Sequence, residues 1–381
     1  MYNISMSKFI GVYGGAFDPP HISHILTAKA LIRERNYDNL ILLPSHNPPH
    51  KNLSASDSDR IKMLQLVADD KMIVSDLEIK RCGIGYTVDY LPEIIKIYGD
   101  NIEYIIGGDS FLNFDKWHKP LEILKLVPIL VVARDGENEK LFDKLKEYDK
   151  VCKKGITIAN FMPESMSSSE IRNRLRLHLR VDEMLDEKIA EYIANNNLYN
   201  EYQSILTQLK NSISEERLLH TKGVVLFALK YADRLKLDYN KVFTASLLHD
   251  CAKNNGDYSY IFEQNLVPLD CKNTPIAHAF CGSVVAKNEY GIQDAEVLDA
   301  IYCHTTAKPQ MSKLAKLVYC ADMLEDGRHF DGVEELRKIF DNDFEKGFFA
   351  CLEHTVKYLM TCGGEIYPLT LDAYNYYKSK K

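Results

Sequence analysis

Long apolar runs are missing from this sequence of 381 residues. The longest, such as Val127–Ala133, fall far short of the roughly 20 residues that a membrane-spanning helix needs. The opening segment Met1–Phe9 also lacks the apolar core of a secretory signal peptide. These absences predict a cytoplasmic protein without a membrane partner.

Paired cysteine spacings are missing as well. The chain has nine cysteines, an odd number, and none of them forms a Cys-x-x-Cys pair. We therefore expect neither a disulfide framework nor a structural zinc site of the usual kind. Reduced thiols fit the predicted cytoplasmic location.

An excess of positive charge is also absent, since the formal net charge is -7 and the sequence pI is about 6.0. This balance excludes a broad nucleic-acid-binding surface, although it leaves room for a local cationic pocket that binds phosphates. The length predicts two domains, each large enough to bury a core of its own.

Short apolar segments alternate with helix-like segments over the first 200 or so residues. Segments that are apolar on both faces and rich in Ile, Leu and Val are typical of buried parallel strands. The alternation predicts an α/β doubly wound parallel sheet of the Rossmann-like kind, with ligands at the carboxyl ends of the strands. The expected strands are Phe9–Tyr13, Leu40–Leu43, Met72–Val74, Tyr104–Ile106, Pro128–Val132 and Ile156–Ile158. The expected helices are His21–Arg35, Ser58–Asp69, Val88–Tyr98, Glu137–Tyr148 and Ser168–Leu177.

Strand-like segments disappear after about Asn200. The pattern predicts an all-α second domain, with the boundary near Tyr199–Glu201 and domains over residues 1–200 and 201–381. The expected helices are Gln203–Lys210, Glu215–Leu235, Asn240–Cys251, Ala277–Tyr290, Ala295–His304, Met311–Met323, Val333–Phe340 and Phe344–Met360.

The first expected strand leads into Gly14–His24, which reads Gly-Gly-Ala-Phe-Asp-Pro-Pro-His-Ile-Ser-His. Glycines let backbone N–H groups approach phosphate oxygens closely, and the N-terminus of a helix beginning near His21 would attract anions. His21 and His24 are three residues apart, so they share a face and could donate hydrogen bonds to a leaving pyrophosphate. A glycine pair alone would fit an ordinary turn, but the full string after a strand favours a phosphate loop.

This string resembles the motif of the bacterial nicotinate-mononucleotide adenylyltransferases, and the resemblance covers roughly residues 8–198. The family's second motif, Ser-Ser-Thr-x-Ile-Arg, is matched by Ser167–Arg172. The resemblance implies transfer of AMP from ATP to nicotinate mononucleotide, with Mg²⁺ bridging phosphate oxygens and with His21, His24 and Arg172 as catalytic residues. The implied ATP ligands are Gly14, Gly15, Phe17, His21, His24, Gly107, Asp109, Arg134, Ser168, Ser169 and Arg172.

The first motif alone does not choose the acceptor, because the superfamily also makes CDP-glycerol, CDP-choline and dephospho-coenzyme A. Segments Asn47–Lys51, Gly85–Asp89 and Lys116–His118 resemble the nicotinate-mononucleotide family. That resemblance implies that Trp117, the only tryptophan, stacks on the pyridine ring. The implied mononucleotide ligands are Asp18, Lys51, Tyr86, Thr87 and Trp117. Nicotinamide mononucleotide, phosphopantetheine and a sugar phosphate remain alternative acceptors.

Two residues depart from the family pattern. Ser23 stands where the family usually has Gly, and Ala16 stands where Thr or Ser is common. We expect Ser23 to lie close to the phosphates and to reduce the tightness of ATP binding without abolishing activity.

Histidines and aspartates recur through the helical half. His249-Asp250 closes one apolar helix and Asp322 closes another, positions where polar residues would otherwise be unusual. Neighbouring helices of a bundle can each direct one ligand inward, and mixed imidazole and carboxylate ligands suit Fe, Mn, Zn or Co. A single histidine is more often a core residue, but six such residues together favour a metal site. The expected ligands are His220, His249, Asp250, His278, His304 and Asp322.

This second pattern resembles the HD phosphohydrolase superfamily, in particular the bacterial HD-domain diadenosine-tetraphosphate hydrolases, over about residues 215–345. The resemblance implies a pair of metal ions, typically iron, and symmetric cleavage of a dinucleoside polyphosphate to two ADP. It gives catalytic roles to Asp250 and Lys253, and phosphate contacts to Lys253, Arg328 and Thr305. Alternatively, this half is a nucleotide-binding regulatory module, and Arg328 forms an ordinary ion pair with Glu325. The sequence leaves homo-oligomerisation open.

Overall fold

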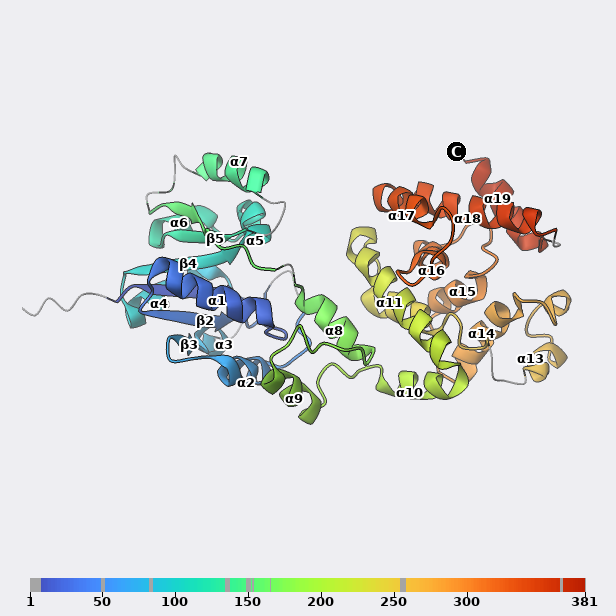
Figure 1. Cartoon of the computed structure of the whole chain (residues 1–381), viewed down its shortest axis with the longest axis horizontal. Helices are drawn as coiled ribbons and strands as arrows, with labels where there is room; N and C mark the ends of the chain where they lie inside the picture. Colours follow the sequence, from blue (N-terminus) through green and yellow to red (C-terminus); the bar gives the residue numbers. More distant parts are fainter. Residues whose placement is uncertain are drawn as a thin grey trace, which may run out of the picture. The chain divides into compact units, whose positions relative to one another are not determined.

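The computed structural model describes residues 8–48, 52–81, 85–133, 138–148, 152, 154–164, 166–253, 258–363 and 366–380. The chain forms two compact units, Met1–Glu201 and Tyr202–Lys381 (Figure 1).

The first unit is built on a six-stranded sheet in the order β3-β2-β1-β4-β5-β6, and every neighbouring pair is parallel. This order is that of a Rossmann-like doubly wound sheet, which confirms the predicted fold class. The chain reverses its direction of winding between the neighbours β1 and β4, and ligands of such sheets bind in the crevice at that point. The strands are β1 (Ile10–Gly15), β2 (Asn39–Pro44), β3 (Met72–Val74), β4 (Ile102–Gly107), β5 (Ile129–Val132) and β6 (Ile156–Ile158).

Successive side chains of the strands point to opposite faces of this sheet, so the sheet has a core on each face. Val12 and Ile41 contribute to the core formed with α4, α5, α6 and α7, while Leu40 and Leu42 contribute to the core formed with α1 and α2. The helices are α1 (Ile22–Arg35), α2 (Asp57–Val67), α3 (Leu77–Arg81), α4 (Thr87–Tyr98), α5 (Gly108–Leu112), α6 (Pro120–Leu126), α7 (Asn138–Tyr148), α8 (Ser168–Arg176) and α9 (Glu187–Asn195), with a 3-10 turn at η1 (Phe114–Lys116).

The described residues of the second unit form helices joined by turns and loops, with no strand among them, which confirms the predicted all-α fold. Its long helix α11 (Glu215–Leu235) buries apolar residues such as Val224, Phe227 and Tyr231 along one side. The other helices are α10 (Gln203–Ser212), α12 (Tyr239–Leu248), α13 (Ser259–Glu263), α14 (Ala277–Asn288), α15 (Ala295–Cys303), α16 (Lys313–Leu324), α17 (Val333–Asn342), α18 (Phe344–Thr361) and α19 (Pro368–Lys378), with a 3-10 turn at η2 (Leu269–Cys271). Among the helices that the structure describes, none has the length and apolarity to cross a membrane.

Candidate active sites

The predicted phosphate loop begins at the carboxyl end of β1, where Gly14 and Gly15 leave no room for a side chain. A Cβ on Gly14 would lie 2.9 Å from the Tyr104 hydroxyl, and one on Gly15 would lie 3.1 Å from the Phe17 ring. Phe17 is 1% exposed and has a left-handed backbone with φ of 48°. Glycine at both positions therefore allows the close packing that sets the path of this loop.

Asp18 fixes the position of the loop through its buried carboxylate. Its carboxylate is 1% exposed and accepts hydrogen bonds from the backbone N–H groups of Ser54 (2.8 Å) and Ala55 (3.0 Å) and from the Tyr199 hydroxyl (2.7 Å). These donors already surround both carboxylate oxygens. The arrangement favours a positioning role for Asp18 over the direct contact with the mononucleotide that the sequence predicted.

The two motif histidines lie together at the start of α1. Their rings stack with centroids 3.6 Å apart, and the backbone N–H of His21 donates to Nδ1 of His24 at 3.2 Å. Because Nδ1 of His24 accepts this bond, the proton of its neutral ring resides on Nε2. His24 also packs against Phe17, at 5.0 Å between ring centroids, which fixes the direction of that donor.

The second motif contacts the first. Ser168 donates a hydrogen bond to the Pro19 carbonyl at 3.1 Å. Arg172 donates through Nη1 to the Asp18 carbonyl at 2.5 Å and through Nη2 to Ser169 Oγ at 3.0 Å. The N-terminal turn of α8, capped by the Ser167 side chain, thus lies directly against the phosphate loop.

The departure at Ser23 has a structural explanation. Its hydroxyl donates to the Glu164 carbonyl at 3.1 Å, and the residue is 8% exposed. The side chain therefore joins α1 to the segment that precedes α8. This bond holds the hydroxyl against Glu164. That Ser23 reduces the tightness of ATP binding stays a prediction.

Two further predicted ATP ligands lie at the carboxyl end of β4. Gly107 ends that strand, and a Cβ there would lie 2.8 Å from Oδ1 of Asp109. Asp109 lies exposed in the first turn of α5 and accepts a hydrogen bond from the Ser110 N–H at 2.9 Å. Arg134, like the predicted mononucleotide ligand Lys51, lies outside the described residues.

At the predicted pyridine site, Tyr86 contacts a residue that was not among the predicted ligands, His118. Tyr86, the N-cap of α4, stacks on the His118 ring at 4.4 Å, which brings two of the predicted segments together. The neighbouring Trp117 is partly buried against Phe114, at 5.2 Å between ring centroids. The Thr87 hydroxyl is buried 3.2 Å from the Tyr90 hydroxyl.

A network of charged residues that the sequence analysis did not predict contacts the phosphate loop through Arg60. Arg60 is fully buried and donates through Nη1 to the Ala16 carbonyl at 2.7 Å. It also pairs with Asp57, whose other oxygen lies 2.5 Å from Nδ1 of His46. The backbone N–H of His46 in turn donates to Glu78 at 3.1 Å. Charged residues on an amphipathic helix usually face water, so only their partners identify this network.

Glu78 is 4% exposed, and burial raises its pKa to about 7. The unfolded chain, with a carboxyl pKa near 4.5, ionises first, so the stability that Glu78 contributes is present below pH 4.5 and is lost as the pH rises through 7. Glu78→Gln should therefore raise the stability of the first unit at pH 8, by up to about 3 kcal/mol, and change it little at pH 4.5.

Urea unfolding followed by tryptophan fluorescence measures this effect, because Trp117 is the only tryptophan and reports on the first unit alone. The exposed Glu93, which pairs with Arg81, provides the control variant Glu93→Gln. Equal stability of Glu78→Gln and the unchanged chain at pH 8 would contradict the prediction.

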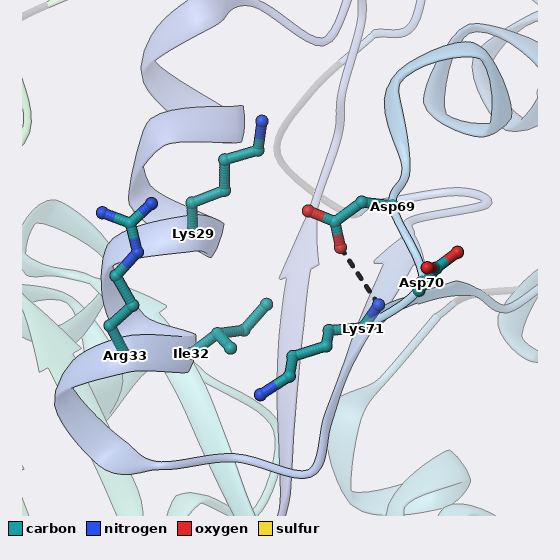
Figure 2. A pocket seen from close by; sticks show the side chains of 6 residues that line it. All are labelled: Lys29, Ile32, Arg33, Asp69, Asp70 and Lys71. Carbon is teal, nitrogen blue, oxygen red and sulfur yellow. Dashed lines mark hydrogen bonds between the residues drawn. The ribbon is translucent and has the colours of Figure 1, made fainter.

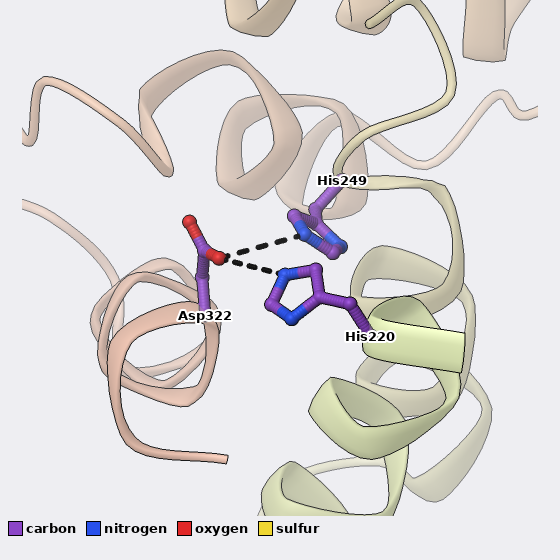
Figure 3. Close-up of side chains that lie close together, drawn as sticks. All are labelled: His220, His249 and Asp322. Atoms are coloured by element: carbon purple, nitrogen blue, oxygen red, sulfur yellow. Dashed lines mark hydrogen bonds and ion pairs between the residues drawn. The ribbon is translucent and has the colours of Figure 1, made fainter. Parts of the chain in front are cut away.

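In the second unit the predicted ligands converge from five helical segments. His220 comes from α11, His278 from α14, and Asp322 from α16, while His249-Asp250 and His304 directly follow α12 and α15. Oδ1 of Asp322 lies 2.9 Å from Nε2 of His220 and 3.9 Å from Nε2 of His249 (Figure 3).

The Asp250 carboxylate lies close to three of the histidines. Its Oδ1 lies 3.2 Å from Nε2 of His278 and 3.4 Å from Nε2 of His304, and its Oδ2 lies 3.6 Å from Nε2 of His249. Two triads result, each with ligand atoms within 4.8 Å of one another, and they share His249. We call them triad A (His220, His249, Asp322) and triad B (His249, Asp250, His304).

These residues fit divalent metal ions. Nε2 of His249 and Oδ1 of Asp250 are buried, and neither has a hydrogen-bond partner among the described residues. Burial lowers the pKa of His249 to about 4 and also lowers the pKa of His278, so both rings are neutral at pH 7. Neutral imidazoles beside carboxylates are what a metal ion requires of its ligands.

Cations surround this centre at partly exposed positions. Arg217 and Lys253 approach Oδ2 of Asp250 at 2.9 and 3.3 Å, and Arg328 approaches Oδ1 of Asp322 at 2.7 Å. Arg328 thus points toward the predicted metal ligands and not toward Glu325. The Thr305 hydroxyl lies 3.1 Å from Nε2 of His304.

A depression of about 490 Å³ in the first unit contains no predicted site residue (Figure 2). Lys29, Ile32 and Arg33 of α1 line it, together with Asp69–Lys71, which immediately precede β3. It therefore lies at the amino end of that strand, opposite the edge where ligands of such sheets bind.

Comparison with known proteins shows the same division of the chain. A family model described as cytidylyltransferase-like matches residues 12–174, and an HD domain model matches residues 217–327. A probable nicotinate-nucleotide adenylyltransferase of Aquifex aeolicus is 42% identical over 141 residues, which are 36% of this chain and 84% of the relative. The symmetrical bis(5'-nucleosyl)-tetraphosphatase of Bacillus subtilis is 33% identical over 179 residues, 46% of this chain and 96% of the relative.

A relative from Mycoplasma genitalium matches along nearly the whole chain. It is a probable nicotinate-nucleotide adenylyltransferase/Ap4A hydrolase, 26% identical over 367 residues, which are 92% of this chain and 98% of the relative. Both resemblances drawn from the motifs are thereby confirmed. The chain belongs to the nicotinate-nucleotide adenylyltransferase family through its first half and to the HD-domain symmetrical tetraphosphatases through its second half.

Proposed function

We propose that the chain carries two enzymes, divided near residue 200. The first transfers AMP from ATP to nicotinate mononucleotide and releases pyrophosphate and deamido-NAD. The observation that carries this assignment is the direct contact between the two motifs, in which Ser168 and Arg172 bond to the backbone of Pro19 and Asp18. A panel of acceptors incubated with ATP and assayed for pyrophosphate release tests it.

In this reaction a phosphate oxygen of the mononucleotide attacks the α-phosphorus of ATP, and the bond to the β-phosphate oxygen breaks. The Nε2 proton of His24, together with His21 and Arg172, stabilises the negative charge that moves onto the leaving pyrophosphate. Gly14 and Gly15 let the loop backbone approach the phosphates. Bound Mg²⁺ would supply further charge neutralisation on the phosphate oxygens. The remaining proposed ATP ligands are Phe17, Gly107, Asp109, Arg134, Ser168 and Ser169.

The pyridine ring is proposed to lie against Trp117, near Tyr86 and the backbone of Thr87, with Lys51 meeting the acceptor phosphate. Trp117→Ala should raise the KM for nicotinate mononucleotide by about 10-fold, since ring stacking contributes roughly 0.5–1.5 kcal/mol beyond the buried area. Pyrophosphate release measured across the acceptor panel checks this result. Equal losses with nicotinate mononucleotide, nicotinamide mononucleotide and phosphopantetheine would mean that Trp117 does not select the acceptor.

The second enzyme is proposed to hydrolyse dinucleoside polyphosphates such as diadenosine tetraphosphate. Water adds to a phosphorus of the central anhydride, the bridging P–O bond breaks, and both halves leave as ADP. The observation that carries this assignment is the buried convergence of His220, His249, His278, His304, Asp250 and Asp322. Two metal ions, proposed to be iron, would supply Lewis acidity when bound there.

Lys253 and Arg328 lie at the rim of this centre, where they would bind phosphate oxygens and orient the substrate. ADP release from diadenosine tetraphosphate, with metal content measured on the same sample, tests the assignment. Bound metal without ADP release would instead support a nucleotide-binding regulatory module.

A further inference from the structure

The four histidines of the metal centre are oriented in two different ways. Three of them have Nδ1 on the carbonyl three residues earlier: His249 on Ser246 (2.7 Å), His278 on Pro275 (2.6 Å) and His304 on Ile301 (2.7 Å). His249 and His304 lie at the C-terminal ends of α12 and α15, where the last carbonyls have no partner within the helix. His278 lies at the start of α14, and the Pro275 carbonyl precedes that helix. Each backbone bond places the ring proton on Nδ1 and leaves Nε2 as the metal-binding atom.

His220 has no such carbonyl at hand. It lies inside α11, where the carbonyls of the preceding turn are committed to the helix. Its Nδ1 instead donates to Oε1 of Glu325 at 3.1 Å. Glu325 is the C-cap of α16, 105 positions further along the chain. It is 5% exposed, and its Oε2 accepts the Gly327 N–H at 2.7 Å.

Two glycines make room for this carboxylate. A Cβ on Gly223, one turn after His220, would lie 2.4 Å from Oε2 of Glu325, and one on Gly327 would lie 3.0 Å from the same oxygen. Glycine is unfavourable inside a helix, so its presence at position 223 needs a local reason. The position of the Glu325 carboxylate supplies that reason.

We propose that Glu325 is a positioning residue that orients His220. Metal binding at triad A would then depend on the Glu325 carboxylate, although this carboxylate is not itself a metal ligand. This inference rests on the proposed metal-dependent function. A carboxylate partner raises the basicity of a ligating imidazole and fixes its ring orientation, and its loss typically lowers metal affinity 10- to 100-fold. Triad B does not include His220, so its metal affinity does not depend on Glu325.

Titration of the metal-stripped full chain with Co²⁺ alone, followed by its visible absorption, tests the proposal without any assay of activity. Glu325→Gln keeps an acceptor oxygen but loses the charge, and it should weaken one of the two Co²⁺ equivalents about 10-fold. Glu325→Ala, and Gly223→Ala through displacement of the carboxylate, should weaken the same equivalent by up to about 100-fold. The second equivalent should stay unchanged in all three variants.

Glu296→Gln is the matched control, because it removes a carboxylate charge in the same unit while Lys241 keeps its pair with Asp294 at 3.0 Å. Its titration should equal that of the unchanged chain. Equal Co²⁺ affinities for Glu325→Gln and the unchanged chain would overturn the proposal, and this variant decides even if Glu325→Ala fails to fold. An unchanged chain that binds no Co²⁺ would instead contradict the proposed metal-dependent function itself.

Discussion

Asp250→Asn should lower the rate of diadenosine tetraphosphate hydrolysis by at least about 1,000-fold, which corresponds to roughly 4 kcal/mol. The Asp250 carboxylate lies within 3.6 Å of the Nε2 atoms of His249, His278 and His304. Asparagine keeps the shape of this side chain but removes the charge that would balance bound metal ions. The effect therefore combines loss of metal with loss of the Lewis acidity on which hydrolysis depends.

ADP release and metal content, measured on the same preparation, distinguish this effect from misfolding. Asp270→Asn is the control, because Asp270 is exposed and its carboxylate accepts a hydrogen bond from the Tyr367 hydroxyl at 3.0 Å, away from the predicted metal ligands. Adenylyl transfer should be unchanged in both variants, since neither residue belongs to the first unit. An Asp250→Asn protein that keeps more than about a tenth of its hydrolysis rate would contradict the assigned role of the carboxylate.

His24→Ala should lower kcat for adenylyl transfer about 100- to 1,000-fold and change the KM for ATP much less. The backbone N–H of His21 fixes the tautomer of His24, so its Nε2 donates where charge accumulates on the leaving pyrophosphate. Such a bond strengthens in the transition state, and its loss therefore appears mainly in kcat.

His178→Asn is the control for this measurement. His178 is exposed in the first unit and has a left-handed backbone with φ of 51°, which asparagine tolerates. The control should keep full activity. A His24→Ala protein with a raised KM and an unchanged kcat would show that His24 only binds the ground state.

The fold could be predicted where the local pattern is strong. Short strands buried on both faces, such as Ile129–Val132, are apolar throughout and stand out between polar segments. Helices α3 (Leu77–Arg81) and α5 (Gly108–Leu112) were missed because five residues are too few to show a helical period. Helix α12 ends at Leu248, three residues before its predicted end, because His249 uses the Ser246 carbonyl.

The sites could be predicted where their residues share a motif. The loop Gly14–His24 and the pair His249-Asp250 are contiguous, so their spacing alone indicates the chemistry. Glu325 is different: sequence proximity suggested an ion pair with Arg328, yet its partner is His220, 105 residues away. Contacts over such distances along the chain depend on tertiary packing, which no local pattern contains.

We propose that this one chain carries out both reactions, each at its own centre. The most direct measurement is product analysis after the full chain is incubated with ATP, nicotinate mononucleotide and diadenosine tetraphosphate, in parallel with His24→Ala and Asp250→Asn. We predict deamido-NAD with equal pyrophosphate, and two ADP for each tetraphosphate consumed, with each variant losing only one of the two products. Loss of both products in either variant, or formation of AMP and ATP from the tetraphosphate, would contradict this assignment of the two reactions.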